Sequence, residues 1–278
     1  GGEVMQKLIV HGPIVQASEK FGDVEVIPDA WGTVNRATGL IEEVTTSRKE
    51  IIDIETTAVF EVPKDGFMMP GLVDAHIHAP QYAFAGIGTN IPLLEWLERF
   101  TFPFEARCED PEWARRVFGA VVRRTLSCGT TTASYFATIH TRASSELAIA
   151  CASLGQRAFV GKVNMDRNSP DFYREQSAEH SLKATSAFAA SVSALGSPLV
   201  SPIITPRFVP TCTSELMTGL GKLAASRGDP IQSHVSENLS EISWVAELHP
   251  ECTSYTGVYA SHGLLTRRTL LPHGMPLT

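Results

Sequence analysis

The sequence predicts an α/β protein, a parallel (β/α)8 barrel of the TIM type that follows a small β-rich unit. From residue 66 onward, segments with strand character alternate with amphipathic helical segments, and no hairpin turn signal separates them. Residues that carry chemistry come directly after several of the predicted strands, as they do at the C-terminal face of a barrel. The first of these strands ends in His-x-His, where an open dinucleotide-binding sheet would carry a glycine-rich loop.

Two units are expected, a β-rich N-terminal subdomain over residues 1–65 and a barrel over residues 66–278. The first unit holds short β-branched or alternating runs between Gly, Pro, Asp and Lys residues, and it shows no helical period. Its predicted strands are residues 8–10, 24–27, 51–54 and 59–62.

The second unit is expected to contain about six of the barrel's strands. Asp110-Pro111-Glu112 begins one of its helices, because the aspartate caps the first turn and the proline fits the first helical position. Because a barrel of this type closes with eight strands, we expect it to be incomplete in this chain. The predicted strands are residues 67–75, 131–137, 157–164, 200–208, 230–235 and 257–263, and further helices are expected at residues 144–154, 179–195, 213–226 and 240–248.

Composition indicates a globular protein and argues against some partners. The formal charge of −7 is the opposite of the basic excess that nucleic-acid-binding surfaces carry, so we expect no nucleic acid partner. No apolar run approaches the ~18 residues that span a bilayer, and the N-terminus lacks a signal-peptide pattern, so we expect no membrane attachment. The five cysteines are scattered and odd in number, which indicates reduced thiols and a cytoplasmic location.

A histidine pair at the end of the first predicted barrel strand is the first candidate site. His76 and His78 lie two residues apart, so on a strand their side chains share a face. Two imidazoles at the mouth of a barrel form half of a zinc site. Exposed histidines can show the same spacing, so the motif alone leaves both interpretations open.

The fifth predicted strand adds a third histidine. His234 lies at its end and would complete three protein nitrogens around a zinc ion, with room for a water molecule. Glu237 follows three residues later, and a carboxylate beside a zinc-bound water can relay a proton to a substrate. A single histidine on an apolar strand is more often a core residue, but histidines at two strand ends together favour the metal site.

Four further residues are candidates for contacts with the water or the substrate. His262 ends the sixth predicted strand, where it would hydrogen-bond the zinc-bound water; the alternative is an exposed loop histidine. Gln81 offers both a donor and an acceptor, which suits the edge of a purine. Arg207 offers a rigid fork to a carbonyl oxygen, and Phe208 offers a ring on which a base can stack. Taken singly, each of these side chains would be assigned to the surface or the core.

Taken together, these segments resemble one enzyme family. Residues 70–78, Pro-Gly-Leu-Val-Asp-Ala-His-Ile-His, are similar to the opening motif of the amidohydrolase superfamily. Between residues 66 and 270 the chain resembles the guanine deaminases of that superfamily at several separate places. The similar segments are residues 79–82, 93–97, 130–132, 135–141, 155–162, 205–208, 232–238 and 261–263.

The resemblance implies a zinc-dependent enzyme that hydrolyses guanine to xanthine and ammonia in purine catabolism. It also implies one zinc ion per chain, a small-molecule substrate and a homodimer. In the family, the proton shuttle is a glutamate, and a further histidine lies beside the hydrolytic water. The residues that the resemblance assigns are the zinc ligands His76, His78 and His234, the substrate-binding residues Gln81, Arg207, Phe208 and His234, and the catalytic residues Glu237 and His262.

One element of the family's pattern has no counterpart in this sequence. Family members carry an aspartate at the end of the eighth strand, in a Gly-Thr-Asp context, as a further zinc ligand and as the base for the water. We therefore expect this chain to be a fragment or a short form, and a short form would be catalytically inactive. Two other interpretations stay open: a related aminohydrolase acting on cytosine, adenosine or s-triazines, and a non-catalytic protein that pairs with a full-length one.

Overall fold

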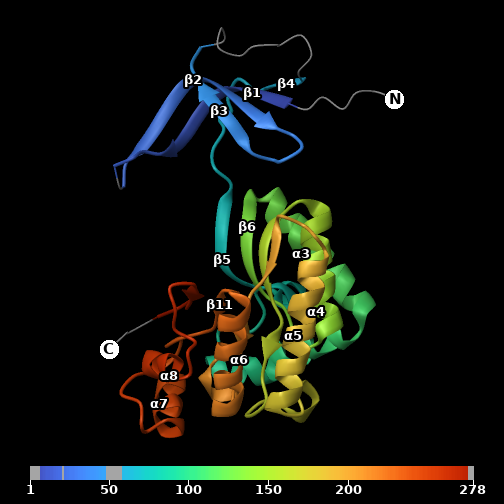
Figure 1. Ribbon diagram of the computed structural model, residues 1–278, viewed down its shortest axis with the longest axis vertical. Coiled ribbons are helices and arrows are strands. Elements are labelled where there is room, and N and C mark those ends of the chain that lie inside the picture. The colour runs from blue at the N-terminus through green and yellow to red at the C-terminus, as the bar shows by residue number, and fades with distance from the viewer. Residues whose placement is uncertain (1–6, 21, 48–57, 275–278) are drawn as a thin grey trace. The chain divides into compact units, whose positions relative to one another are not determined.

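The structure of the chain is a computed structural model that describes residues 7–20, 22–47 and 58–274. The chain forms two compact units, Gly1–Gly71 and Leu72–Thr278, and each has its own sheets (Figure 1). The strand predicted at residues 51–54 lies outside the described residues.

The first unit is a four-stranded sheet made of β1 (Lys7–Ala17), β2 (Val24–Asn35), β3 (Ile41–Thr45) and β4 (Ala58–Glu61). The strand order is β3-β2-β1-β4; β1 and β4 are parallel, and the other two pairs are antiparallel. Asn35 closes the turn between β2 and β3, because its side-chain oxygen accepts the N–H groups of Ala37 and Thr38. Ile9 and Trp31 form the buried centre of this sheet.

The second unit is built on parallel strands. They are β5 (Leu72–His78), β6 (Thr130–Phe136), β7 (Arg157–Gly161), β8 (Val163–Asn164), β9 (Val200–Pro202), β10 (Thr205–Pro206), β11 (Ile231–Gln232) and β12 (Thr269–Leu270). The pairs run β5-β6-β7-β9, β8-β10 and β11-β12, all parallel, and a bridge from Ile204 to Ile231 joins the last two groups. Strands that follow each other along the chain therefore lie side by side, which confirms the predicted α/β barrel architecture.

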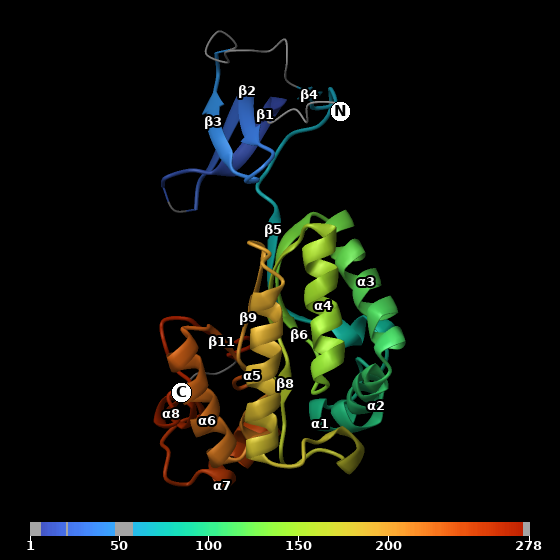
Figure 2. The same ribbon diagram turned by 45° about the vertical axis from the view of Figure 1, so that its right-hand side comes forward.

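Helices pack against one face of these strands. The main ones are α3 (Pro111–Ser127), α4 (Thr141–Leu154), α5 (Ala178–Ala194), α6 (Ser214–Arg227), α7 (Leu239–Leu248) and α8 (Tyr255–Ser261). Helices α3 to α6 contact one another in chain order (Figure 2). Asp110, Ser177 and Thr213 cap α3, α5 and α6, since each side chain accepts a backbone N–H of the first turn.

A long connection between β5 and α3 contains only short helical segments. They are a 3-10 turn at Ala79–Phe84, α1 (Leu93–Trp96), a π-helical stretch at Leu97–Thr101, α2 (Phe102–Ala106) and a second 3-10 turn at Arg107–Glu109. The Trp96 indole N–H donates to the Ile87 carbonyl at 2.9 Å, which holds the loop between the first two segments. This connection follows the end of the first barrel strand and therefore lies at the C-terminal edge of the barrel strands.

The apolar core lies between the strands and the helices. Phe118 of α3, Leu147 of α4 and Phe188 of α5 are buried together with Val160 of β7. Burying an apolar side chain of this size contributes about 1.5–3 kcal/mol. The helices are thus held on the outer face, and the strand ends stay available for a site.

A polar layer crosses the inner side of the barrel strands. Gln232 donates to the Tyr135 carbonyl and to the Thr205 hydroxyl, both at 3.0 Å, and it accepts the Ser134 hydroxyl at 2.8 Å. Gly161 makes room for this layer, because a Cβ there would lie 1.8 Å from Thr205 Oγ1. These bonds join three strands just below the edge where the candidate residues lie.

The sixth barrel strand does not lie where the sequence predicts it. Most of residues 257–263 belong to α8, whose first turn is capped by the Ser254 hydroxyl. Val258 and Tyr259 are buried on one helical face, and a short apolar run of this kind fits a helix as well as a strand. The strand that pairs with β11 is β12, which comes after the helix.

The structure adds two observations on the helices and the cysteines. None of the helices among the described residues is long and apolar enough to cross a bilayer. All five cysteines carry free thiols. Burial raises the pKa of Cys108, Cys151 and Cys212 to about 12, so these three are inert core residues.

Candidate active site

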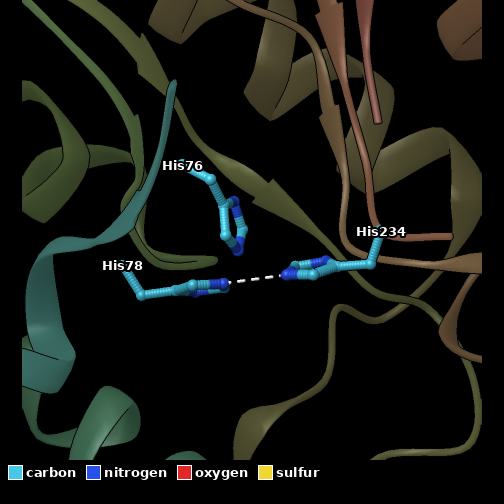
Figure 3. Close-up of side chains that lie close together, drawn as sticks. All are labelled: His76, His78 and His234. Carbon is cyan, nitrogen blue, oxygen red and sulfur yellow. Dashed lines mark hydrogen bonds between the residues drawn. The ribbon is translucent and has the colours of Figure 1, made fainter. Parts of the chain in front are cut away.

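Three histidines from two barrel strands meet at the C-terminal edge of the second unit (Figure 3). His76 and His78 belong to β5, and His234 lies two residues after the end of β11. The Nε2 atoms of His78 and His234 lie 2.9 Å apart, and the ring centroid of His76 lies 4.8 Å from that of His234. One ring nitrogen from each residue falls within 4.8 Å of the other two. The structure thus brings the three predicted ligands together.

Local structure directs the first two imidazoles to one side. An irregularity in the pairing of β5 with β6 lies between Asp74 and Ile77, and the Asp74 carboxylate accepts the His76 N–H at 3.1 Å. The ring of His78 stacks on Phe136 with the centroids 4.6 Å apart. The strand end and the aromatic contact together fix the His-x-His pair.

A backbone hydrogen bond fixes the tautomer of His234. Its Nδ1 lies 2.6 Å from the carbonyl oxygen of Arg207, and a carbonyl can only accept, so Nδ1 carries the proton. The Nε2 lone pair then points toward the other two histidines. Metal-binding histidines commonly show this arrangement, in which the outer nitrogen donates to a carbonyl or carboxylate.

All three imidazoles are neutral, which is the form that binds metal. Burial, followed by the charge of His273, lowers the pKa of His76 to about 4. Burial and the neighbouring histidine and arginine charges hold the pKa of His78 and His234 well below the usual range. The Nδ1 atoms of His76 and His78 are buried without a hydrogen-bond partner. This donor set, with its unpaired polar atoms, fits a metal ion.

A carboxyl group and a fourth histidine lie beside the three. Burial, followed by the charge of Glu241, raises the pKa of Glu237 to about 7. The Oε2 atom of Glu237 lies 3.6 Å from Nε2 of His273, whose ring stacks on His234 with the centroids 5.5 Å apart. A group with a pKa near neutrality, next to a metal site, can both give and take a proton.

Sequence reasoning assigned His262 to this position, and the structure does not bring it there. His262 is the C-cap of α8, and its Nδ1 donates to the Val258 carbonyl at 2.7 Å. A parallel β-bridge between Val235 and His273 instead places His273 beside the segment that follows β11. The signal was present: Leu-Leu-Pro-His-Gly at 270–274 ends an apolar run in His-Gly, as residues 260–263 do.

These groups surround a cavity of about 470 Å³. The connection after β5 supplies an apolar wall that includes Phe84, Leu93 and Trp96. His262 is the only predicted site residue outside the lining. The predicted site residues on the wall are Gln81, Arg207, Phe208, Glu237 and the three histidines His76, His78 and His234.

Arg207 reaches this cavity with its charge already paired. Its two terminal nitrogens donate to the Glu105 carboxylate at 2.6 and 3.2 Å. Burial alone would lower the pKa of Arg207, but the Glu105 charge outweighs it and raises the pKa, so the guanidinium stays protonated. Glu105 has no signal in the sequence, because it lies in the irregular connection and meets Arg207 across 102 positions of the chain.

A parallel barrel with this set of groups at its C-terminal edge defines a class of hydrolases. The chain belongs to the amidohydrolase family, whose family model matches residues 67–278.

Individual relatives are more specific. A probable guanine deaminase of Schizosaccharomyces pombe is 45% identical over 276 residues, which cover 97% of this chain and 51% of that protein. A guanine deaminase of Dictyostelium discoideum is 42% identical over 283 residues, 97% of this chain and 62% of that protein. The chain therefore spans between half and two thirds of the length of these curated relatives.

A solved structure agrees with the sequence relatives. The crystal structure of guanine deaminase from C. acetobutylicum, with bound guanine in the active site, is similar to this chain with a TM-score of 0.89 and 36% identity. The similarity covers 96% of this chain and 62% of that one.

Proposed function

We propose that the protein containing this chain hydrolyses guanine to xanthine and ammonia, as a step of purine catabolism. One observation carries the proposal: three neutral imidazoles, a carboxyl with a pKa of about 7 and a buried guanidinium line a single cavity. The 45% identity to a probable guanine deaminase favours guanine over other rings as the substrate.

A single zinc ion per chain, held by His76, His78 and His234, is part of this proposal. Three imidazole nitrogens suit zinc and leave one position open for water. A zinc ion at this place supplies Lewis-acid chemistry, since it lowers the pKa of a bound water to about 7.

Glu237 is proposed to move the protons. Because its pKa is about 7, both protonation states are populated near neutral pH. In its protonated form it can donate a proton to a ring nitrogen of guanine, and the carboxylate can then take the proton of the attacking water and deliver it to the departing amine. The hydroxyl that becomes the new carbonyl returns a proton to Glu237. His273, 3.6 Å from its carboxylate, is proposed to take the role beside the hydrolytic water that the sequence suggested for His262.

The remaining wall residues are proposed to bind the base. The charged guanidinium of Arg207 is suited to the carbonyl oxygen of guanine, and the Gln81 amide to a ring edge. Phe208 is buried at the cavity wall, where its ring is available for stacking. Holding the ring in one orientation removes much of the entropy cost of the reaction.

A substrate panel tests the proposal directly. The intact protein, loaded with zinc, is incubated with guanine, adenosine, cytosine and an s-triazine, and ammonia and xanthine are measured. We expect turnover of guanine and little of the others. Rapid turnover of another ring would point to a different aminohydrolase, and an intact protein that holds one zinc ion yet forms no xanthine would refute the proposal.

Two further features are proposed from the same resemblance. We expect a homodimer, to be measured as the molar mass in light scattering, and a cytoplasmic location, to be checked by imaging of the tagged protein. A monomeric mass at micromolar concentration, or a tagged protein confined to an organelle, would contradict the respective expectation.

A further inference from the structure

A buried carboxylate lies behind the histidines, on the irregular connection that follows β5. Glu105 in α2 has no exposed surface, and it binds the Arg207 guanidinium through both oxygens. The Tyr173 hydroxyl donates to the same carboxylate at 2.8 Å. A bidentate pair of this kind fixes the plane of the guanidinium, because two parallel hydrogen bonds allow one relative orientation.

The same carboxylate also faces a candidate metal ligand. Its Oε1 atom lies 3.9 Å from Nδ1 of His78, and that nitrogen is buried without a hydrogen-bond partner. The other nitrogen of His78 faces His234. If Nε2 held a metal ion, Nδ1 would carry the proton and would face the Glu105 carboxylate.

The two candidate ligands His78 and His234 can be compared. At His234, the outer nitrogen donates to the carbonyl oxygen of Arg207. At His78, the outer nitrogen lies 3.9 Å from the carboxylate of Glu105, which itself binds the side chain of Arg207. The two outer nitrogens thus lie next to groups of one residue pair, the Arg207 carbonyl at His234 and the Glu105 carboxylate at His78.

We propose that Glu105 is a positioning residue that couples the metal site to the substrate site, orienting His78 on one side and the Arg207 guanidinium on the other. This role of Glu105 rests on the proposed function for the identity of the substrate. The expected effect on metal binding is independent of the proposed function. Outer groups of this kind change metal affinity or activity by about 10- to 100-fold when they are mutated.

Glu105→Gln is the main test, because glutamine keeps the size of the side chain and one acceptor oxygen but loses the charge. We expect zinc affinity, measured by competition with a chelator, to fall by about 10- to 100-fold. We also expect the KM for guanine to rise about 10-fold, because Arg207 loses its fixed plane. Replacing both Glu105 and Arg207 should cost less than the sum of the single changes.

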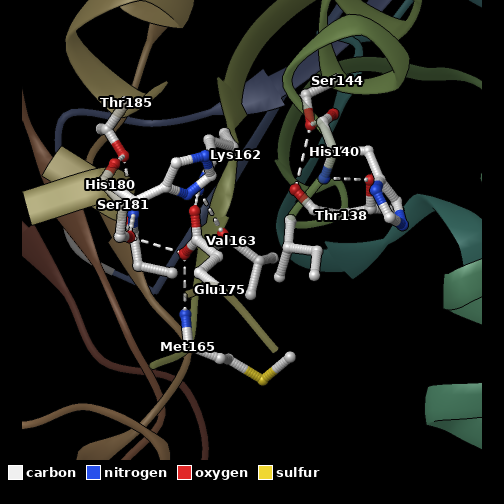
Figure 4. A network of polar contacts seen from close by, with 12 residues as sticks. Thr138, His140, Ser144, Lys162, Val163, Met165, Glu175, His180, Ser181 and Thr185 are labelled. Carbon is white, nitrogen blue, oxygen red and sulfur yellow. Dashed lines mark hydrogen bonds and ion pairs between the residues drawn. The ribbon is translucent and has the colours of Figure 1, made fainter. Parts of the chain in front are cut away.

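Glu175→Gln is a matched control. Glu175 is also a buried carboxylate, and it forms an ion pair with Lys162 (Figure 4). It lies outside the cavity lining. Its loss should lower stability and leave zinc affinity and KM at the wild-type values. Equal loss of zinc affinity in both variants would mean that Glu105 acts through general stability, and it would overturn the proposal.

A milder variant keeps the test valid if Glu105→Gln does not fold. Tyr173→Phe removes one hydrogen bond from the same carboxylate, and we expect zinc affinity to fall about threefold. Unchanged zinc affinity in folded Glu105→Gln or in Tyr173→Phe overturns the proposal. A wild-type protein that binds zinc without deaminating guanine instead overturns the proposed function, and the zinc comparison remains decisive for Glu105.

Discussion

A single hydrogen bond fixes which nitrogen of His234 faces the cavity. The Arg207 carbonyl accepts the Nδ1–H of His234, whereas Nδ1 of His78 has no hydrogen bond and lies 3.9 Å from the Glu105 carboxylate. The His-x-His spacing could be read from the sequence because it reflects the two-residue repeat of a strand. The groups that orient the rings come from distant parts of the chain, so local patterns carry no sign of them.

Substitution of two histidines tests the assignment at the residue scale. His273→Gln should lower kcat for guanine by about 100-fold, because His273 lies beside Glu237 and His234. His262→Gln is the matched control, since His262 ends α8 outside the cavity lining, and its kcat should stay within about twofold of the wild-type value. The reverse order of effects would restore His262 to the site.

The pKa of Glu237 gives a prediction about stability in the metal-free protein. The carboxyl has a pKa near 4.5 in the unfolded chain and near 7 in the folded protein. It therefore lowers the free energy of unfolding progressively as the pH rises between these two values. Glu237→Gln removes this penalty. At about pH 8 the variant should gain about 3 kcal/mol in unfolding free energy relative to the wild-type protein, and the gain should vanish below about pH 4.5.

Urea unfolding of both metal-free proteins across this pH range measures the difference. Parallel stability curves, with no pH-dependent gain in the variant, would mean that the folded carboxyl ionises at its ordinary pKa. The proton-carrying role of Glu237 would then lose its support.

At the scale of elements, the packing inside the barrel depends on a position where the β7 backbone lies close to side chains of neighbouring strands. Gly161 of β7 faces Thr205 and Gln232, and no larger residue fits there. The sequence predicts the strand and its neighbours well, because strand and helix periods alternate clearly. It misplaces the sixth strand, because the run at 257–263 has no periodicity long enough to distinguish helix from strand, and the Ser254 cap decides the outcome.

Gly161→Ala should destabilise the second unit by about 1–3 kcal/mol, since the new Cβ would lie 1.8 Å from Thr205 Oγ1. Gly119→Ala in α3 is the matched control, because its Cβ would meet only the flexible end of Arg123. Alanine favours the helix interior by about 1 kcal/mol over glycine, so this variant should be neutral or more stable. Thermal unfolding of the two variants compares them; equal loss would contradict the packing described for Gly161.

At the scale of the whole molecule, the site joins a barrel edge to a long irregular connection. The candidate residues of the barrel could be predicted because they lie at or just after the ends of predicted strands. They are His76, His78, His234 and Glu237. The connection supplies Glu105 and the apolar wall, and its short helical turns have no periodicity from which contacts could be predicted. Its position depends on tertiary contacts, such as the ion pair between Glu105 and Arg207.

We propose that a single metal ion at the three histidines supports guanine deamination by the intact protein. The most direct test of this central claim is a titration of the metal-free intact protein with zinc, in which xanthine formation is followed at each ratio. We predict activity that rises in proportion to bound zinc and reaches its plateau at one ion per chain. Activity that is full without metal, or that first appears after a second ion binds, would contradict the claim.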